Sequence, residues 1–131
     1  MAPNGLVTAA VVYVPARDLM FAAPLDGVAT CNGDVISASG RAEVAGANIL
    51  TTKANIAPQH WIGPVPDVTR SFRASVAYRL CLGVQGAFDG LLSLRQAWEW
   101  DIAAGTLIAE RAGAMVTDRR GSALRFSAYR V

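Results

Sequence analysis

Residues 98–113 constrain the fold of this chain more than any other stretch. They start with Trp-Glu-Trp-Asp and continue with residues that favour a helix. Asp101 is predicted at the N-cap or in the first turn, where a carboxylate accepts unpaired backbone N–H groups and complements the helix dipole. Gly113 is predicted to end the helix in the left-handed conformation. One face carries small and apolar residues at helical spacing and can lie close against a sheet: Gly105, Ile108, Ala109 and Ala112.

A strand and a turn are predicted after this helix. Residues 114–117, Ala-Met-Val-Thr, favour a strand, and residues 118–121, Asp-Arg-Arg-Gly, favour a turn. Taken alone, Asp101 is interpreted as a helix cap, because that is the usual role of an aspartate before a helix. Only its wider context suggests another role.

The N-terminal part of the chain is predicted to form a meander of strands. Residues 6–14 are a nearly continuous apolar, β-rich run, which is typical of a central strand buried on both faces. Residues 15–18 supply a turn. Asn32-Gly33 is a strong tight-turn signal because Asn and Gly accept positive φ. The other strands of the meander are predicted at residues 19–23, 28–31 and 35–38.

The middle of the chain is less regular. Residues 44–51 fit either a short strand or a helix, and residues 53–66 are loop-like because they contain Pro58, Pro64 and Pro66. An amphipathic helix is predicted from about residue 72 to 86, and a strand over residues 91–94. Cys81 lies in the apolar pattern of that helix, which indicates a buried thiol.

The C-terminal third resembles the inositol monophosphatase superfamily of Mg²⁺-dependent, lithium-sensitive phosphatases. That family carries a Trp-Asp before a small-residue helix, then a Glu-Ala-Gly-Gly-like helix end, a Val-Thr-Asp strand and a Gly-x-Pro-Leu-like turn. The match runs in order through Trp100-Asp101-Ile102-Ala103-Ala104-Gly105, Glu110-Arg111-Ala112-Gly113, Val116-Thr117-Asp118 and Gly121-Ser122-Ala123-Leu124. The meander fits too, because family members carry a Pro-Ala-x-Asp-like turn, a Phe-x-Ala strand and an Asn-Gly turn in this order.

The resemblance implies a fold, an activity and a metal. The fold is α/β, a mixed-sheet fragment of the family's layered α-β-α-β-α sandwich. The form Glu99-Trp100-Asp101 is more similar to the bacterial 3'(2'),5'-bisphosphate nucleotidases than to the inositol branch. The implied parent activity is therefore hydrolysis of 3'-phosphoadenosine 5'-phosphate to AMP, with water as the nucleophile. Asp101 corresponds to a Mg²⁺ ligand, and Trp100 is expected to pack behind it.

Ser75 corresponds to a family position whose small hydroxyl residue lies near the substrate phosphate or sugar. Read from the residues alone, Ser75 stabilises the start of the predicted helix. Family members usually have Gly-Ser or Gly-Thr there, whereas this chain has Ala74-Ser75. Arg70 and Arg73 could meet a second phosphate, but solvated arginines are the preferred interpretation. The inositol branch places a glutamate within a segment that here reads Leu-Ser-Leu at residues 92–94, which argues against an inositol phosphate substrate.

Most of the family's metal ligands are missing from this sequence. The family binds two or three Mg²⁺ ions through an upstream glutamate, an Asp-Pro-x-Asp-Gly-Thr motif and the Trp-Asp aspartate. Neither of the first two is present, and one carboxylate cannot hold a catalytic metal pair. We therefore expect residues 1–131 to be a single unit, the C-terminal part of such a phosphatase, that is inactive without an N-terminal metal-site half. The alternatives are an inositol-1-monophosphatase and a non-catalytic α/β domain that binds a partner or an anion.

Composition and charge restrict the classes of binding partner that we expect. The net charge is only +2 and no basic run is interleaved with aromatics, so no nucleic acid partner is expected. Residues 6–14 are too short for a membrane span, and a cytoplasmic location is the default expectation. Cys31 and Cys81 fit no metal-ligand spacing, and the lone His60 favours a structural or surface role. The expected partners are a small phosphorylated substrate, a missing N-terminal half or a second copy of the chain.

Overall fold

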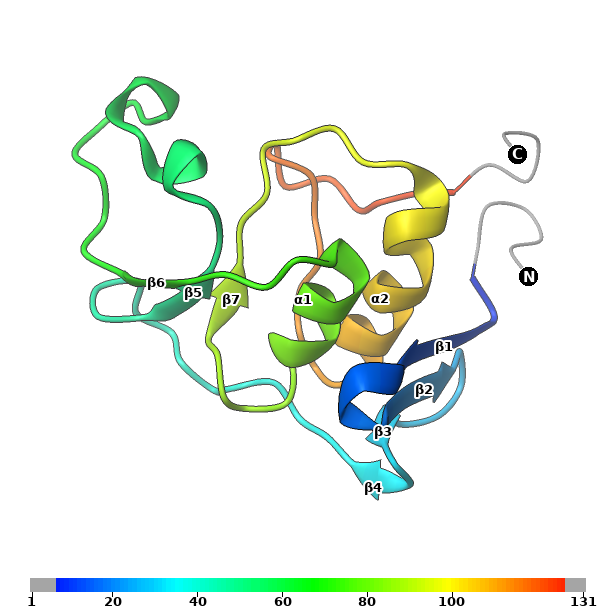
Figure 1. Ribbon diagram of the computed structural model, residues 1–131. Helices are drawn as coiled ribbons and strands as arrows, with labels where there is room; N and C mark the ends of the chain where they lie inside the picture. Colours follow the sequence, from blue (N-terminus) through cyan, green and yellow to red (C-terminus); the bar gives the residue numbers. More distant parts are fainter. Residues whose placement is uncertain (1–6, 127–131) are drawn as a thin grey trace.

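The computed structural model describes residues 7–126, which form two small sheets and two helices (Figure 1). Strands β1 (Ala9–Val14), β2 (Leu19–Pro24), β3 (Thr30–Cys31) and β4 (Asp34–Val35) form an antiparallel sheet in that order. Strands β6 (Thr69–Ser71), β5 (Asn48–Leu50) and β7 (Gly90–Leu91) form a parallel sheet with β5 in the centre. The predicted α/β class with strands of both orientations is confirmed.

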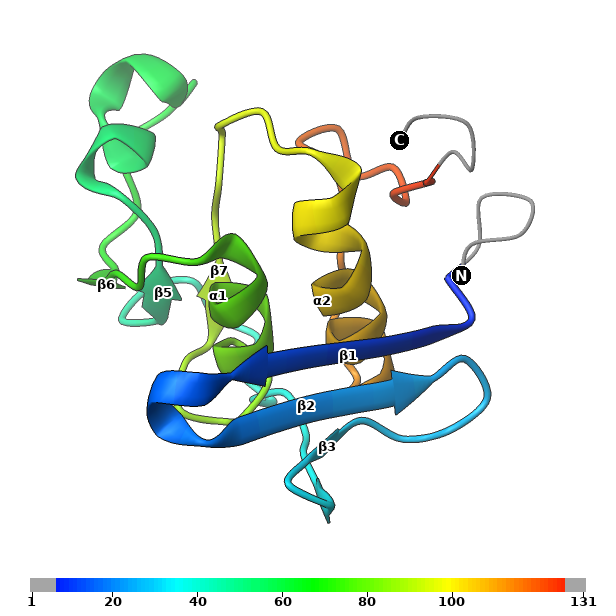
Figure 2. The same ribbon diagram turned by 45° about the vertical axis from the view of Figure 1, so that its right-hand side comes forward.

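Helices α1 (Val76–Leu82) and α2 (Glu99–Arg111) lie side by side and start at the same end of the molecule (Figures 1 and 2). They cross one face of the antiparallel sheet, and the parallel sheet lies beyond α1. Phe21 of β2, Cys81 of α1 and Ile108 of α2 are fully buried in the core that these layers share. The prediction that Cys81 is a buried thiol is therefore confirmed.

Strand β1 lies at the edge of its sheet, and the prediction that it is central and buried on both faces is wrong. Its burial alternates: Ala10 faces the core, whereas Val11 is 60% and Tyr13 is 50% exposed. The helices cover only one face of β1 within residues 7–126, so the opposite face is open. Residue 6, where the strand was predicted to start, lies outside the described residues.

The tight turn between β3 and β4 is as predicted. Asn32 has φ 50° and Gly33 has φ 85°, the pair of positive values that a two-residue hairpin turn requires. The Asn32 side chain also links this turn to the first hairpin, since its Oδ1 accepts from the Met20 N–H at 2.8 Å and its Nδ2 donates to the Asp18 carbonyl at 3.0 Å.

Helix α1 is shorter than the predicted helix over residues 72–86. Residues Thr69–Ser71, just before the predicted start, pair with β5, and the helix begins only after Ser75, whose backbone is extended as the N-cap. Gly83 then ends the helix as its C-cap. The ambiguous stretch 44–51 contains strand β5, and the predicted strand over residues 91–94 is reduced to β7.

The end of α2 follows the prediction, but the next strand does not. Gly113 has φ 94°, and its N–H donates to the Glu110 carbonyl while the Ala114 N–H donates to the Ala109 carbonyl, both at 3.0 Å. This pair of bonds is a Schellman motif. The strand predicted at residues 114–117 is reduced to one bridge between Thr117 and Ala123.

The predicted turn at residues 118–121 is present, because the Gly121 N–H donates to the Asp118 carbonyl at 3.1 Å. Residues 53–66 contain two short 3₁₀ turns, Lys53–Ile56 and Pro58–His60, and His60 is exposed as expected. The longest helix within residues 7–126 has 13 residues, and none there is long and apolar enough to cross a bilayer.

Candidate functional site

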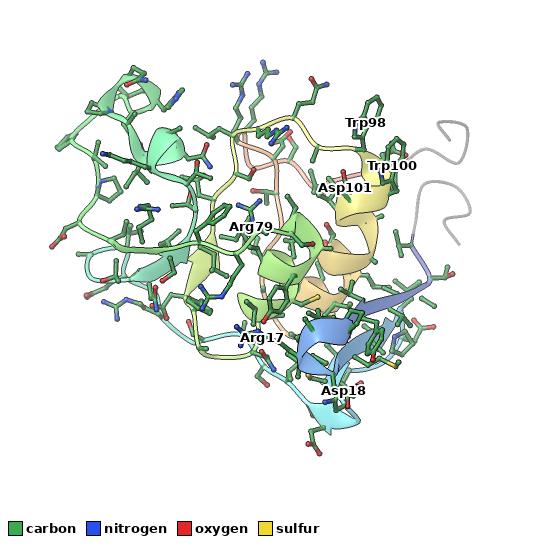
Figure 3. The ribbon with its side chains drawn as sticks, viewed as in Figure 1. Arg17, Asp18, Arg79, Trp98, Trp100 and Asp101 are labelled. Atoms are coloured by element: carbon green, nitrogen blue, oxygen red, sulfur yellow. The ribbon has the colours of Figure 1, made fainter. Side chains whose placement is uncertain are left out.

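Asp101 is the third residue of α2, so the prediction of a first-turn position is confirmed and the N-cap alternative is wrong. The cap is Trp98, whose extended backbone (φ −80°, ψ 152°) precedes the helix and whose carbonyl accepts from the Asp101 N–H at 3.0 Å. The Asp101 side chain is exposed (Figure 3). Among residues 7–126, no hydrogen bond or ion pair engages its carboxylate. The group is thus free to bind a cation.

Two tryptophans on either side of Glu99 form a stacked pair next to Asp101 (Figure 3). The rings of Trp98 and Trp100 have centroids 4.8 Å apart and planes inclined by only 7°. Trp98 is 66% and Trp100 is 62% exposed, so Trp100 is not packed behind Asp101 as expected. The two side chains lie against each other on the surface instead.

Ser75 is the N-cap of α1 and not a residue of its first turn. Its hydroxyl accepts a hydrogen bond from the Tyr78 N–H at 3.3 Å, which is the structural role that the residues alone suggested. Ser75 is exposed and immediately precedes α1, and α1 and α2 start at the same end of the molecule. Ser75 and Asp101 thus belong to the starts of two neighbouring helices, and no hydrogen bond joins them within residues 7–126.

The close approach of the two helices depends on Gly105. A Cβ at this position would lie 2.7 Å from Leu80 Cδ1 and 2.8 Å from Leu80 Cβ. The small face of α2 was predicted to approach a sheet, but Gly105 approaches α1. Ile108, Ala109 and Ala112 share the core with the antiparallel sheet, as that prediction required.

Arg79 is a buried cation that the sequence analysis missed. It is only 6% exposed, its guanidinium lies 5.2 Å from the Phe72 ring centroid, and its Nε has no acceptor within the described part of the chain. Burial lowers the pKa of Arg79. The sequence offers only a weak signal for this burial, because Arg79 falls three residues after Val76, beside the edge of the apolar face of the predicted helix.

The other two arginines of this region differ from each other. Arg70 is exposed, in line with the preferred interpretation. Arg73 is half-buried: one Nη donates to the Phe72 carbonyl at 2.7 Å, and the guanidinium lies 5.8 Å from the Phe88 ring centroid. It is therefore held by its neighbours and is less free than a solvated arginine.

Two other aspartates, Asp89 and Asp118, hold loops in place through hydrogen bonds. The Asp89 carboxylate accepts from the Ser39 hydroxyl at 2.8 Å and from the Asn48 N–H at 2.7 Å. The Asp118 carboxylate accepts from the N–H groups of Arg120 and Ser122 at 2.8 and 2.9 Å. These bonds to the charged form lower the pKa of both carboxyl groups, with the backbone donors the largest cause.

The described residues do not by themselves fit a catalytic Mg²⁺ site. Magnesium takes six oxygen ligands and is held by carboxylates together with water and phosphate. No group of three or more His, Cys, Asp or Glu side chains within residues 7–126 is placed to hold a metal ion. Asp101 can offer one carboxylate, and a metal there needs ligands beyond those that residues 7–126 group around it.

The two sheets and the helix pair between them define a layered α/β protein. The sequence profile of the inositol monophosphatase family matches residues 1–131. The chain belongs to the inositol monophosphatase family.

Known relatives agree with this assignment. Inositol monophosphatase 2 of tomato (Solanum lycopersicum) is 34% identical over 130 residues, which are 92% of this chain and 49% of the relative. A SuhB protein of Neisseria meningitidis serogroup B is 30% identical over 127 residues, 90% of this chain and 48% of the relative. The solved inositol monophosphatase II of Staphylococcus aureus has the same fold, with a TM-score of 0.80 at 16% identity over 95% of this chain and 49% of that chain. The chain thus spans about half the length of these relatives.

Proposed function

We propose that this chain is the C-terminal part of a Mg²⁺-dependent phosphomonoesterase whose parent activity is 3'(2'),5'-bisphosphate nucleotidase. The observation that carries the proposal is the exposed, unengaged carboxylate of Asp101 in the first turn of α2, in a chain of the inositol monophosphatase family. Asp101 supplies one metal ligand, and Ser75 contacts the substrate phosphate or sugar. The remaining ligands come from an N-terminal half, and a cytoplasmic location stays a prediction.

The substrate assignment rests on two sequence features. Glu99 precedes the Trp-Asp pair, as in the nucleotidase branch, and residues 92–94 lack the glutamate of the inositol branch. The fold does not choose between the two, since the staphylococcal protein has been solved with inositol monophosphate and with 2'AMP, at TM-scores of 0.79 and 0.78 to this chain. Inositol-1-monophosphatase activity is therefore the second candidate, and a non-catalytic α/β binding domain is the third.

Joining the chain to the N-terminal half of a related phosphatase tests the proposal. The joined protein should release phosphate from 3'-phosphoadenosine 5'-phosphate in the presence of Mg²⁺, and faster than from inositol 1-phosphate. Asp101→Asn removes the charge that holds the metal, so activity should fall by orders of magnitude. The helix should lose less than about 1 kcal/mol, because Asp101 is not the cap.

The matched control is Asp26→Asn, which changes an exposed aspartate in the loop after β2. It should leave both rate and melting temperature unchanged. Equal rates for Asp101→Asn and the parent would remove Asp101 from the site. The chain without an added half should show no turnover above a buffer blank, and a turnover that Asp101→Asn abolishes would contradict the need for that half.

A further inference from the structure

The Trp98–Trp100 pair is the largest exposed aromatic feature among the described residues. Both indoles are more than half exposed, and they stack face to face at 4.8 Å. Each indole carries a large apolar surface that a soluble protein usually covers. Because each ring covers only one face of the other, the outer face of the pair can take a further flat ring.

Helix stability does not explain a tryptophan at position 98. Trp98 is the N-cap of α2, and its side chain makes no capping hydrogen bond. Ser, Thr, Asp or Asn at this position would satisfy a free N–H group and stabilise the helix. Trp98 is also not part of the buried core of residues 7–126. The exposed Trp98 side chain stabilises neither α2 nor the core, so we infer that it serves ligand binding.

Three exposed arginines lie in two segments at this end of the molecule. The loop after β7 leads into α2 and carries Arg95, and the orange turn at residues 118–121 carries Arg119 and Arg120 (Figures 1 and 2). Both segments lie at the end where α2 starts, and all three arginines are exposed. The Asp118 carboxylate in the same turn is engaged by backbone N–H groups. Flat aromatic rings, with arginine-bearing segments at the same end of the molecule, match a ligand that has both an aromatic ring and phosphates.

We propose that the Trp98–Trp100 pair is a stacking platform for the purine base of a nucleotide substrate. This inference rests on the proposed function, because it takes the phosphate end of the ligand to lie at Asp101. A base stacks on an aromatic side chain whatever its sequence context, since every base has a π-face. An inositol phosphate has no such face and cannot use the pair. The pair therefore selects nucleotides over sugar or polyol phosphates.

Tryptophan fluorescence of the purified chain, excited at the red edge of the indole band, tests the inference without metal or turnover. Adenosine 3',5'-bisphosphate should quench the emission saturably and change the near-ultraviolet circular dichroism of the stacked pair. Inositol 1-phosphate and ribose 5-phosphate, at the same concentrations, should change neither signal. Trp98→Ala should weaken binding by about tenfold, the scale of one lost base–aromatic stack.

Two variants separate stacking from folding. Trp98→Phe keeps a ring and should bind nearly as well as the parent, whereas Trp61→Phe, in the loop after the second 3₁₀ turn, should not change the affinity. Far-ultraviolet circular dichroism checks that α2 persists in each variant. The inference fails if Trp98→Ala binds as tightly as the parent. It also fails if inositol 1-phosphate gives the same saturation, or if no purine-dependent quenching appears through the millimolar range.

The outcome is separable from that of the proposed function. One possible result is that the chain binds purine nucleotides saturably, with weaker binding in Trp98→Ala, while the joined protein hydrolyses nothing. That result would support the stacking platform and contradict the proposed activity. If the joined protein hydrolyses the bisphosphate and its KM is unchanged in Trp98→Ala, the proposed activity is supported and the stacking platform is contradicted.

Discussion

At the scale of single residues, Gly105 sets how closely α1 and α2 approach each other. The nearest atoms to an added Cβ belong to Leu80, and one of them is Leu80 Cβ itself, which cannot rotate away. A side chain at position 105 would therefore push α1 and α2 apart. Because Ser75 and Asp101 are carried by these helices, their relative placement depends on this contact.

Gly105→Ala should destabilise the chain by about 1–2 kcal/mol. Alanine gains up to about 1 kcal/mol of helix propensity, but overpacking of a well-filled contact costs about 1–3 kcal/mol. Urea unfolding measures the difference. Gly83→Ala is the matched control: its φ is −60° and its added Cβ would lie 3.4 Å from the nearest atom, an ordinary contact, so it should be neutral or stabilising.

A double mutant identifies the cause. Leu80→Ala removes the Cδ1 and Cγ atoms that Gly105→Ala meets but keeps the Cβ, so it should relieve part of the clash, and the two substitutions together should cost less than the sum of their separate effects. A stabilised Gly105→Ala would show that the helices do not approach each other at this glycine, and additive effects would show that Leu80 Cδ1 and Cγ do not cause the cost.

At the scale of secondary-structure elements, the parallel sheet depends on the carboxylate of Asp89. Asp89, just before β7, accepts from the Asn48 N–H at the start of β5, while the Asp89 N–H donates to the Asn48 carbonyl at 2.8 Å. The Ser39 hydroxyl joins the loop before β5 to the same group. Asp89 therefore ties two strands and a loop together, and it does so in its charged form.

Acid should weaken this link. The pKa of Asp89 is lowered in the folded state, so its contribution is fully present above the unfolded pKa of about 3.9 and is lost as pH falls through the folded value. The melting temperature should thus drop as pH falls below about 4. Asp89→Asn should lower the melting temperature at neutral pH and reduce the acid drop, whereas Asp26→Asn should change neither. An unchanged acid drop in Asp89→Asn would contradict this role.

At the scale of the whole molecule, the antiparallel sheet has one open apolar face. Register places Val11 beside Ala22 and Tyr13 beside Met20 on this face, and Met20 is 48% exposed. No charged residue of β1 or β2 interrupts it. An uncharged apolar face next to an unpaired edge strand favours association with another protein surface.

We expect the purified chain to self-associate at micromolar and higher concentrations, through this face or the edge of β1. Val11→Lys and Met20→Lys together should shift it towards monomer in sedimentation velocity, because each places a charge on the apolar face. Val28→Lys, at an exposed valine outside the strands, is the control and should not shift the chain towards monomer. A monomer over the whole concentration range, with cooperative unfolding, would contradict the expectation.

Local sequence determined the features that depend on a few adjacent residues. Asn32-Gly33 predicted its turn, and Gly113 predicted the end of α2, because positive φ is a property of the residue type. Asp101 was placed in the first turn of α2 for a similar reason, since carboxylates favour helix N-termini. The motifs around Trp100-Asp101 identified the family, because they depend on order along the chain, and the family profile matches residues 1–131.

Tertiary structure alone decided which surfaces are covered. An apolar run such as that of β1 is compatible with burial on one face or on two, and only the placement of α1 and α2 leaves Val11 and Tyr13 exposed. The predicted helix was shortened to α1 at both ends, because Ser75 keeps an extended backbone as its N-cap and Gly83 is its C-cap. Arg79 became a buried cation and Trp98 an exposed ring because burial depends on neighbours that are distant in sequence, which no local pattern specifies.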